Sequence, residues 1–268
     1  MSNAPTLKAP WLNNYGDVPH VLQYHKGTMF EALNDAASLY PKNIAYDFFG
    51  NTSTYERLTR DIHKAARAFR ALGIKENDRV TLCMPNAPQT IFCFYALNLI
   101  GAIANMIHPL SSEGEIEFYL RDSKSVAVLT LDQFYYKFEE VRKRVDFPHL
   151  IITSVSDVFS PLLKAGYALT EGRKVKKLPK SAPVILWKDF LKKGEDYNDE
   201  YRVPRKAEDA AAILYSGGTT GTTKGILLTN LNFNALYQQL DAMGQCLEPG
   251  KAMLSVMPMF HGFGLGVS

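Results

Sequence analysis

The chain has 268 residues, 46% of them hydrophobic, and a formal net charge of +3. This length allows one or two domains with a substantial core, and the small net charge argues against a nucleic-acid binder. The three cysteines, at positions 83, 93 and 246, form no C-x-x-C pair, and the amino terminus has no signal-peptide pattern. We therefore expect a cytoplasmic protein whose thiols are reduced and buried.

The first strongly periodic segment predicts an amphipathic helix from Tyr55 to Leu72. Its apolar residues recur at spacings of three and four, which places them on one helical face. Gly73 followed by Ile74 is typical of a glycine C-cap with a trailing hydrophobic contact.

Residues 80–112 contain no Lys, Arg, Asp or Glu, so a membrane span has to be considered. Prolines and asparagines interrupt this stretch, and a spanning helix needs about 20 mostly apolar residues. A buried unit explains the pattern better, with a strand at Arg79–Met84, a helix at Pro88–Ile100 and a strand at Ala104–Ile107. We expect no transmembrane segment.

Two later apolar runs, at 126–129 and 150–152, are continuous rather than alternating. Such strands are covered on both faces, as in a parallel sheet flanked by helices. Helices predicted at Ser112–Asp122 and Phe134–Val145 would supply the crossover connections. The sequence therefore predicts an α/β fold with parallel-rich sheets flanked by helices.

Residues 171–180, called here the basic segment, read EGRKVKKLPK and carry five basic side chains against one acid. We favour a solvated loop over contact with a membrane surface or an acidic partner. The polar residues 192–206 are expected to link the first α/β layer to the next strand.

The most informative stretch is the glycine loop, defined here as Tyr215 to Gly225. It contains four glycines, five Ser or Thr hydroxyls and one lysine. Glycines let the backbone approach a ligand closely, and backbone N–H groups with hydroxyls and a lysine can surround a phosphate. The composition indicates a site for nucleotide phosphates, with a flexible surface turn as the alternative.

The order of residues differs from the common pattern G-x-x-x-x-G-K-S/T, because Thr223 precedes Lys224. Strands are predicted on both sides of the loop, at Ala210–Tyr215 and Gly225–Thr229. A helix follows only afterwards, with Asn230 as its cap and an apolar stripe formed by Phe233, Leu236, Leu240 and Met243. The pattern predicts a strand–loop–strand phosphate site in which a helix dipole is not the main attraction.

A second motif, MPMFHGFG, occupies Met257 to Gly264. We predict a buried strand from Lys251 to Met257, stopped by Pro258, which brings an aromatic ring, an imidazole and two glycines to a strand end. In open α/β sheets, ligands bind just outside the carboxyl ends of the strands. A single histidine beside apolar residues is, on its own, more often structural than catalytic.

Together the two motifs resemble the signatures of the adenylate-forming superfamily, which comprises acyl-CoA synthetases, amino-acid adenylation domains and luciferases. The glycine loop is similar to the family pattern Y/F-T-S-G-T-T-G-x-P-K-G and departs from it at Ser216, Gly217 and Thr223. Gly217 is a variation associated with long- and medium-chain acyl-CoA synthetases, and Thr223 in place of proline is expected to loosen the turn. The second motif resembles P-x-F-H-x-x-G, which lines the carboxylate pocket. The similarity covers residues 28–268.

The resemblance implies a two-step reaction. A carboxylate attacks the α-phosphate of ATP, and a thiol, usually that of coenzyme A, then displaces AMP. Mg²⁺ is expected to bridge phosphate oxygens, with the Thr220 hydroxyl among its contacts. The residues expected to bind the ATP phosphates are Ser216, Gly217, Gly218, Thr219, Thr220, Gly221, Thr222 and Lys224.

Phe260, His261 and Gly262 are expected to bind the carboxylic acid, and His261 is the candidate catalytic residue because it would position the reacting carboxylate. Amino-acid adenylation domains usually carry aspartate at the position of His261. Histidine there favours an acid without a free amine, and a fatty acid is the expected substrate.

The resemblance also suggests an N-terminal extension at 1–27, a first α/β subdomain at 28–205 and the start of a second at 206–268. The family's adenine site, ribose-binding aspartate, hinge and catalytic lysine lie downstream of the second motif. We therefore expect an N-terminal fragment that is inactive by itself. The alternatives are an amino-acid adenylation domain, a phosphate-transferring ATPase and a non-catalytic nucleotide-binding module, and the oligomeric state stays open.

Overall fold

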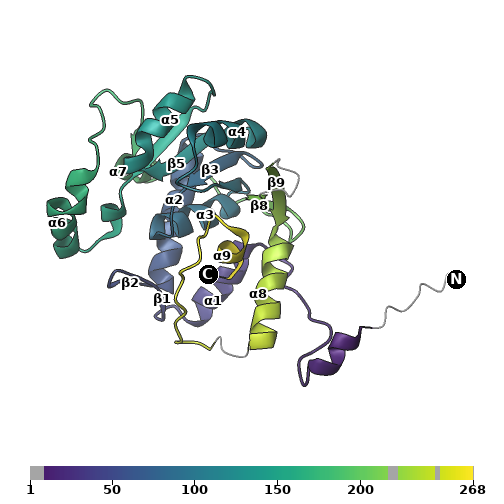
Figure 1. The fold of residues 1–268 in the computed structure, drawn as a ribbon. Helices are drawn as coiled ribbons and strands as arrows, with labels where there is room; N and C mark the ends of the chain where they lie inside the picture. The colour runs from purple at the N-terminus through teal and green to yellow at the C-terminus, as the bar shows by residue number, and fades with distance from the viewer. Residues whose placement is uncertain (1–8, 217–222, 245–247, 268) are drawn as a thin grey trace.

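A mostly parallel sheet forms the centre of the computed structural model, which describes residues 9–216, 223–244 and 248–267. Within these ranges, seven strands form one sheet in the order β7-β6-β5-β3-β4-β8-β9 (Figure 1). All neighbouring strands are parallel except β8 and β9, which are antiparallel. The strands are β3 (Arg79–Cys83), β4 (Ile103–Met106), β5 (Ala127–Leu131), β6 (His149–Thr153), β7 (Ile185–Leu186), β8 (Ala210–Ser216) and β9 (Lys224–Thr229).

Helices cover both faces of this sheet, which confirms the predicted α/β fold. Leu82 and Leu129 pack in a cluster with α2 and α3, whereas Cys83 and Val128 pack in a second cluster with α4 and α5. Successive residues of one strand therefore enter different clusters, and this explains why the apolar runs are continuous. The helices are α2 (Tyr55–Ala71), α3 (Pro88–Leu99), α4 (Glu113–Ser123) and α5 (Tyr135–Arg142).

The local signals for α2 and α3 are confirmed. Gly73 has a φ of +83°, and the Ile74 N–H donates to the Phe69 carbonyl at 3.1 Å, as a glycine C-cap requires. Most positions of α3 are buried, which accounts for its lack of charge. In the described part of the chain, no helix is both long enough and apolar enough to cross a membrane.

The remaining elements surround this core. A short hairpin of β1 (Ile44–Phe48) and β2 (Asn51–Thr54) follows α1 (Met29–Leu39), and its turn residues Phe49 and Gly50 both have positive φ. Further along the chain are α6 (Pro161–Leu169), α7 (Trp187–Lys193), α8 (Asn230–Gly244) and α9 (Gly262–Val267), with 3-10 turns at Pro10–Asn14, Asp132–Phe134, Val155–Val158 and Glu171–Lys174.

Two of the three cysteines lie in the described part of the chain. Cys83 and Cys93 are free and buried, as predicted, and burial raises the pKa of both thiols. Cys246 lies outside the described residues. The division at residues 205 and 206 stays a prediction, although β8 pairs with β4 and so continues the same sheet across that point.

The predicted cap of α8 is wrong. Thr229 precedes the helix, and its hydroxyl accepts from the Asn232 N–H at 3.3 Å, while Asn232 Oδ1 accepts from the Thr229 N–H at 2.9 Å. Asn230 is instead buried and points to other elements: its Oδ1 accepts from the Met29 N–H at 3.1 Å and from Asn98 Nδ2 at 2.7 Å. Its Nδ2 donates to the carbonyls of Lys206 and Asp209.

The predicted buried strand at Lys251–Met257 is also wrong. These residues form no strand, and Leu254 and Val256 are 83% and 67% exposed. A strand requires a partner with free backbone groups, and within the described residues none pairs with this segment. On α8, Met243 of the expected apolar stripe is exposed, whereas Phe233 packs against the core cluster.

The Asn230 contacts lead to a stability prediction. We expect Asn230→Ala to lower the free energy of unfolding by about 2–4 kcal/mol, because it leaves the buried donors of Met29 and Asn98 without their acceptor. The measurement is urea unfolding followed by circular dichroism. Asn34→Ala, at an exposed position of α1, is the control and should change stability by less than about 0.5 kcal/mol. Equal effects of the two substitutions would contradict this role of Asn230.

Candidate functional site

The base of the glycine loop is a fixed antiparallel ladder. Ser216, the last residue of β8, pairs with Lys224, the first residue of β9, and Tyr215 pairs with Gly225. Because β8 runs parallel to β4, Ser216 lies at the carboxyl edge of the parallel sheet. The strand–loop–strand prediction is therefore confirmed at its two ends. The candidate residues that lie outside the described part of the chain are Gly217, Gly218, Thr219, Thr220, Gly221 and Thr222.

Tyr215 attaches this ladder to α4. Its ring centroid lies 4.3 Å from that of Tyr119, and its hydroxyl donates to the Tyr119 carbonyl at 3.3 Å. Burial, together with the nearby Asp122 carboxylate, raises the pKa of Tyr215, so its hydroxyl stays protonated and can donate. Opposite it, a Cβ atom at Gly225 would lie 2.8 Å from Asp122 Oδ2, which shows how closely β9 passes α4.

The second motif forms a tight turn that leads into α9. The His261 N–H donates to the Pro258 carbonyl at 3.0 Å, and His261 Nδ1 accepts from the Phe263 N–H at 3.3 Å. An accepting Nδ1 leaves the proton of a neutral imidazole on Nε2, which can then donate to a ligand oxygen. His261 is exposed, so Nε2 has room for such a ligand. The ring of Phe260 lies 4.3 Å from that of His108, measured between centroids.

Asn86 holds this turn in place, although no motif in the sequence predicted a role for it. Its Nδ2 donates to the carbonyls of Met257 at 2.8 Å and Ser255 at 3.2 Å, and its Oδ1 accepts from the Met259 N–H at 2.8 Å. Asn86 follows β3 directly, so it lies at the same edge of the sheet as Ser216. One feature of the sequence could have indicated Asn86: it lies between Pro85 and Pro88, shortly after a buried strand.

The structure brings the two motifs together at β8. A Cβ atom at Gly262 would lie 3.7 Å from Leu214 Cδ1, and Leu214 is two residues before Ser216. Met259 and Leu265, on either side of His261, belong to the same core cluster as Leu214. The candidate phosphate residue Ser216 and the candidate acid-binding residues therefore belong to one region of the sheet edge.

Neither cavity found in the described part of the chain is lined by a candidate site residue. One, of about 540 Å³, is lined by the basic segment, Asp132 and Asp189, and the other, of about 660 Å³, lies between the basic segment, α5 and α6. Among the described residues, no group of three or more His, Cys, Asp or Glu side chains could hold a metal ion. The described candidate residues lie at the carboxyl edge of the sheet, apart from these two cavities.

Comparison with known proteins assigns the chain to a family. Residues 33–268 match the AMP-binding enzyme family. The chain belongs to that family. It is 31% identical over 261 residues to a long-chain-fatty-acid–CoA ligase of Bacillus subtilis, covering 96% of this chain and 46% of that protein. A protein of the same name from Salmonella typhimurium is 32% identical over 272 residues, with 97% and 47% covered.

The fold agrees with this assignment. The chain superposes on the crystal structure of a long-chain-fatty-acid-CoA ligase from Archaeoglobus fulgidus with a TM-score of 0.72 and 21% identity. That match covers 92% of this chain and 45% of the other. The chain therefore spans about half the length of the curated relatives that it matches.

The turn of the second motif depends on Gly264. A Cβ atom there would lie 2.0 Å from the Pro258 carbonyl oxygen and 2.8 Å from that of Met257. We expect Gly264→Ala to lower the free energy of unfolding by about 1–3 kcal/mol, because two backbone segments must separate. The measurement is urea unfolding, with Gly114→Ala as the control, since a Cβ atom at Gly114 in α4 meets no atom within 4 Å. A Gly264→Ala protein as stable as the control would contradict this close approach.

Proposed function

We propose that this chain is the ATP- and acid-binding part of an AMP-forming acid–thiol ligase that activates a fatty acid and transfers it to coenzyme A in the cytoplasm. The observation that carries the proposal is the pairing of Ser216 with Lys224 beside the His261 turn, in a chain of the AMP-binding family. The names of its relatives support the fatty-acid class.

The glycine loop would bind the β- and γ-phosphates of ATP, which leave as pyrophosphate. Lys224 is exposed at the start of β9 and is joined by no ion pair to any other described residue, so its charge is available to a phosphate. Ser216 is held opposite it and would add a hydroxyl. Interactions of this kind lower the barrier by stabilising the charge that develops on the leaving group.

The donor set fits a Mg²⁺ ion that arrives with ATP. Mg²⁺ keeps several waters and is often bound by substrate phosphates with few protein ligands. A loop of hydroxyl groups, with Thr220 as the proposed ligand, suits such an ion better than a dedicated protein cage would. When bound, Mg²⁺ would neutralise charge on the phosphate oxygens.

The His261 turn would bind the carboxylate. With Nδ1 accepting from the Phe263 N–H, Nε2 of the neutral ring can donate to a carboxylate oxygen and orient it toward the α-phosphate. His261 would therefore act by positioning, because an ionised carboxylate needs no base to attack. Phe260 and Gly262 would form adjacent walls of the acid site.

An amino-acid adenylation domain is the second candidate within the superfamily, and a non-catalytic nucleotide-binding module is a third. His261, rather than an acid at this position, favours a substrate without an amine. The three proposals differ in carboxylate-dependent exchange of pyrophosphate into ATP. A fatty-acid ligase would support this exchange with fatty or aryl acids, and an amino-acid adenylation domain would support it with amino acids. A non-catalytic module would support it with no acid at all.

The same exchange assay, run on the protein as its gene encodes it, tests the role of Lys224. We expect Lys224→Ala to reduce exchange in the active protein by about a hundredfold or more, because a charge on the leaving pyrophosphate is no longer neutralised. Lys42→Ala, at another exposed lysine, is the control and should leave the rate unchanged. Exchange at the wild-type rate by Lys224→Ala would refute the phosphate role.

Two substitutions of His261 test the acid site. Asparagine and aspartate are nearly equal in size, and both can accept from the Phe263 N–H, so they differ mainly in charge. We expect His261→Asp to raise the KM for a fatty acid at least about tenfold above that of His261→Asn, because two carboxylates repel each other. If the two variants have the same KM, the substrate carboxylate does not approach residue 261.

A further inference from the structure

The positive charge of the protein is concentrated in one segment. Residues 161–182, which comprise α6 and the basic segment, contain six Lys or Arg and one Glu. The rest of the chain contains 24 Lys or Arg and 26 Asp or Glu. The surplus that makes the protein basic therefore lies entirely in these 22 residues. Figure 1 shows that α6 projects from the molecule on the side away from α8 and β9.

An apolar stripe on α6 faces the solvent. Leu162 and Leu169 are 85% and 62% exposed, and Ala165 lies between them at helical spacing. No residue of α6 is buried. On the opposite face of α6, the Tyr167 ring lies 5.7 Å from that of Phe159, measured between centroids. The helix is nevertheless well defined at its start, because the Ser160 hydroxyl caps it and Pro161 occupies its first turn.

On its other face, through Phe159, α6 adjoins the β1–β2 hairpin. Phe49, in the turn of that hairpin, is 71% exposed, and its ring lies 5.7 Å from Phe159. Phe159 stands immediately before the cap of α6, so two segments separated by more than a hundred residues present apolar side chains next to each other. The Tyr167 side of α6 therefore adjoins the hairpin, and the leucine stripe is the apolar face that stays exposed. Exposed apolar groups that adjoin each other mark an interaction surface.

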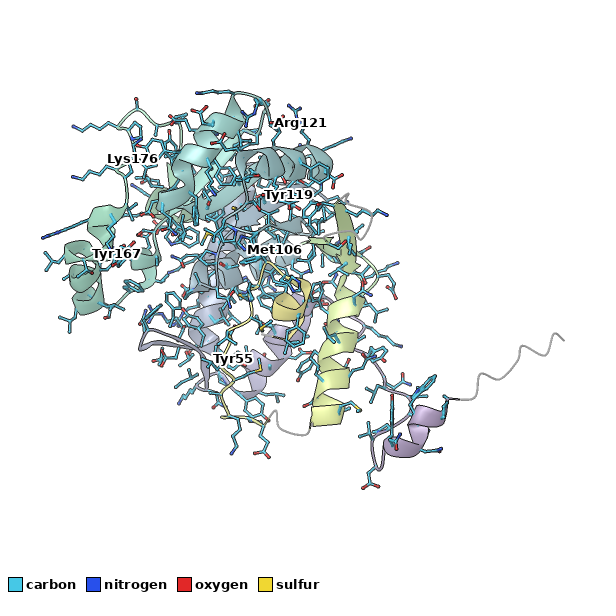
Figure 2. All side chains as sticks on the ribbon, viewed as in Figure 1. Tyr55, Met106, Tyr119, Arg121, Tyr167 and Lys176 are labelled. Carbon is cyan, nitrogen blue, oxygen red and sulfur yellow. The ribbon has the colours of Figure 1, made fainter. Side chains whose placement is uncertain are left out.

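The basic segment is attached to α5 beside this surface. The Tyr136 hydroxyl donates to the Lys177 carbonyl at 2.9 Å, and Lys176 Nζ lies 3.6 Å from the centroid of the Tyr136 ring. Figure 2 shows Tyr167 and Lys176 on the same side of the molecule. The basic segment and α6 are therefore held on the same side of the molecule before any partner binds.

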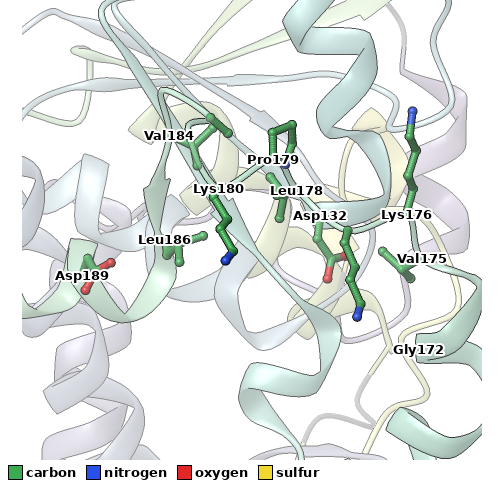
Figure 3. Close-up of a pocket in the computed structure, with 12 residues that line it drawn as sticks. Asp132, Gly172, Val175, Lys176, Leu178, Pro179, Lys180, Val184, Leu186 and Asp189 are labelled. Atoms are coloured by element: carbon green, nitrogen blue, oxygen red, sulfur yellow. The ribbon is translucent and has the colours of Figure 1, made fainter.

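The cavity beneath the basic segment is a poorer candidate for a ligand than the outer surface. Its lining includes three lysines, at positions 176, 177 and 180, and two carboxylates, Asp132 and Asp189 (Figure 3). The two carboxylates offset much of the lysine charge toward a small anion inside. Arg173, in contrast, is exposed and lines neither cavity, whereas the exposed Lys174 pairs with Glu171 at 2.6 Å and lines the other cavity.

We propose that α6 and the basic segment bind the surface of a membrane that contains anionic lipids. The lysines and arginine would lie among the lipid phosphates, and the side chains of Leu162 and Leu169 would enter the boundary between headgroups and acyl chains. An acidic protein or a nucleic acid would match the charge but would leave the leucine stripe in water. This surface is separate from the candidate ATP and acid site and does not depend on the proposed function.

The test is co-sedimentation of the chain with vesicles of phosphatidylcholine alone and with about 30% phosphatidylglycerol, at physiological salt. We expect binding to the anionic vesicles only. The triple variant Arg173→Gln, Lys177→Gln, Lys180→Gln should weaken it on the order of a hundredfold. The matched control, Lys42→Gln, Lys75→Gln, Lys251→Gln, removes three exposed charges elsewhere and should bind as the wild type does.

A second pair of variants tests the apolar contribution. Leu162→Ser with Leu169→Ser should weaken vesicle binding at least about tenfold, whereas Leu39→Ser with Leu110→Ser, also at exposed positions, should not. Circular dichroism of each variant verifies its fold. No binding to anionic vesicles, or equal loss in the basic variant and its control, would overturn the proposal. So would binding that polyglutamate or RNA abolishes and that the loss of both leucines does not change, since that result indicates a soluble polyanion as the partner.

Discussion

The pairing of β8 with β4 is the constraint on which the candidate site depends. Ala104 is in register with Ala212, and Asn105 with Ile213, so β8 continues the parallel sheet instead of starting another one. The register of β4 against β3 is fixed in turn by Asn105 Nδ2, which donates to Thr81 Oγ1 at 2.8 Å. A shift of one residue would move each side chain of the strand to the other face. Ser216 therefore reaches the edge of the sheet because residues far earlier in the chain set the register.

Three segments meet at that edge for the same topological reason. Asn86 follows β3, His108 follows β4, and Ser216 ends β8, and all three strands are parallel. Two of these residues contact the second motif: the Asn86 side chain bonds to the backbone of Met257 and Met259, and the His108 ring lies against that of Phe260. The turn that presents His261 is thus supported by strand ends and by the close approach of Gly264 to Pro258, without a strand of its own. A site built this way can be positioned even though its own segment is irregular.

The sequence predicted the elements whose causes are local. The spacing of apolar residues in α2, the glycine at its end, and the uncharged stretch around α3 all act within a few turns, and the structure confirms them. The resemblance at the glycine loop and at His261 identified the family. Residues 217–222 lie outside the described part of the chain, so their assignment to phosphates stays a prediction.

The errors concern residues whose partners are distant in the chain. Asn230 has a side chain that is typical of a helix cap, but its Oδ1 accepts from the N–H of Met29, 201 residues earlier. The neighbouring Thr229 caps the helix instead. Leu254 and Val256 have the apolar character of a buried strand, yet burial depends on a covering partner that composition does not reveal. Asn86 was missed because its role is defined only by the backbone that it holds.

Lys224 and the basic segment lie near opposite edges of the sheet. Lys224 begins β9, the strand at one edge, while the basic segment immediately precedes β7, the strand at the other. Six strand spacings of about 4.8 Å separate these edges by about 29 Å, whereas physiological salt screens exposed charges over about 8 Å. The basic segment therefore contributes little to the potential at the glycine loop, and the proposed phosphate site would obtain its attraction from Lys224. Conversely, a membrane surface that contacted α6 would leave open to solvent the opposite edge of the sheet, where the ATP and acid site is proposed.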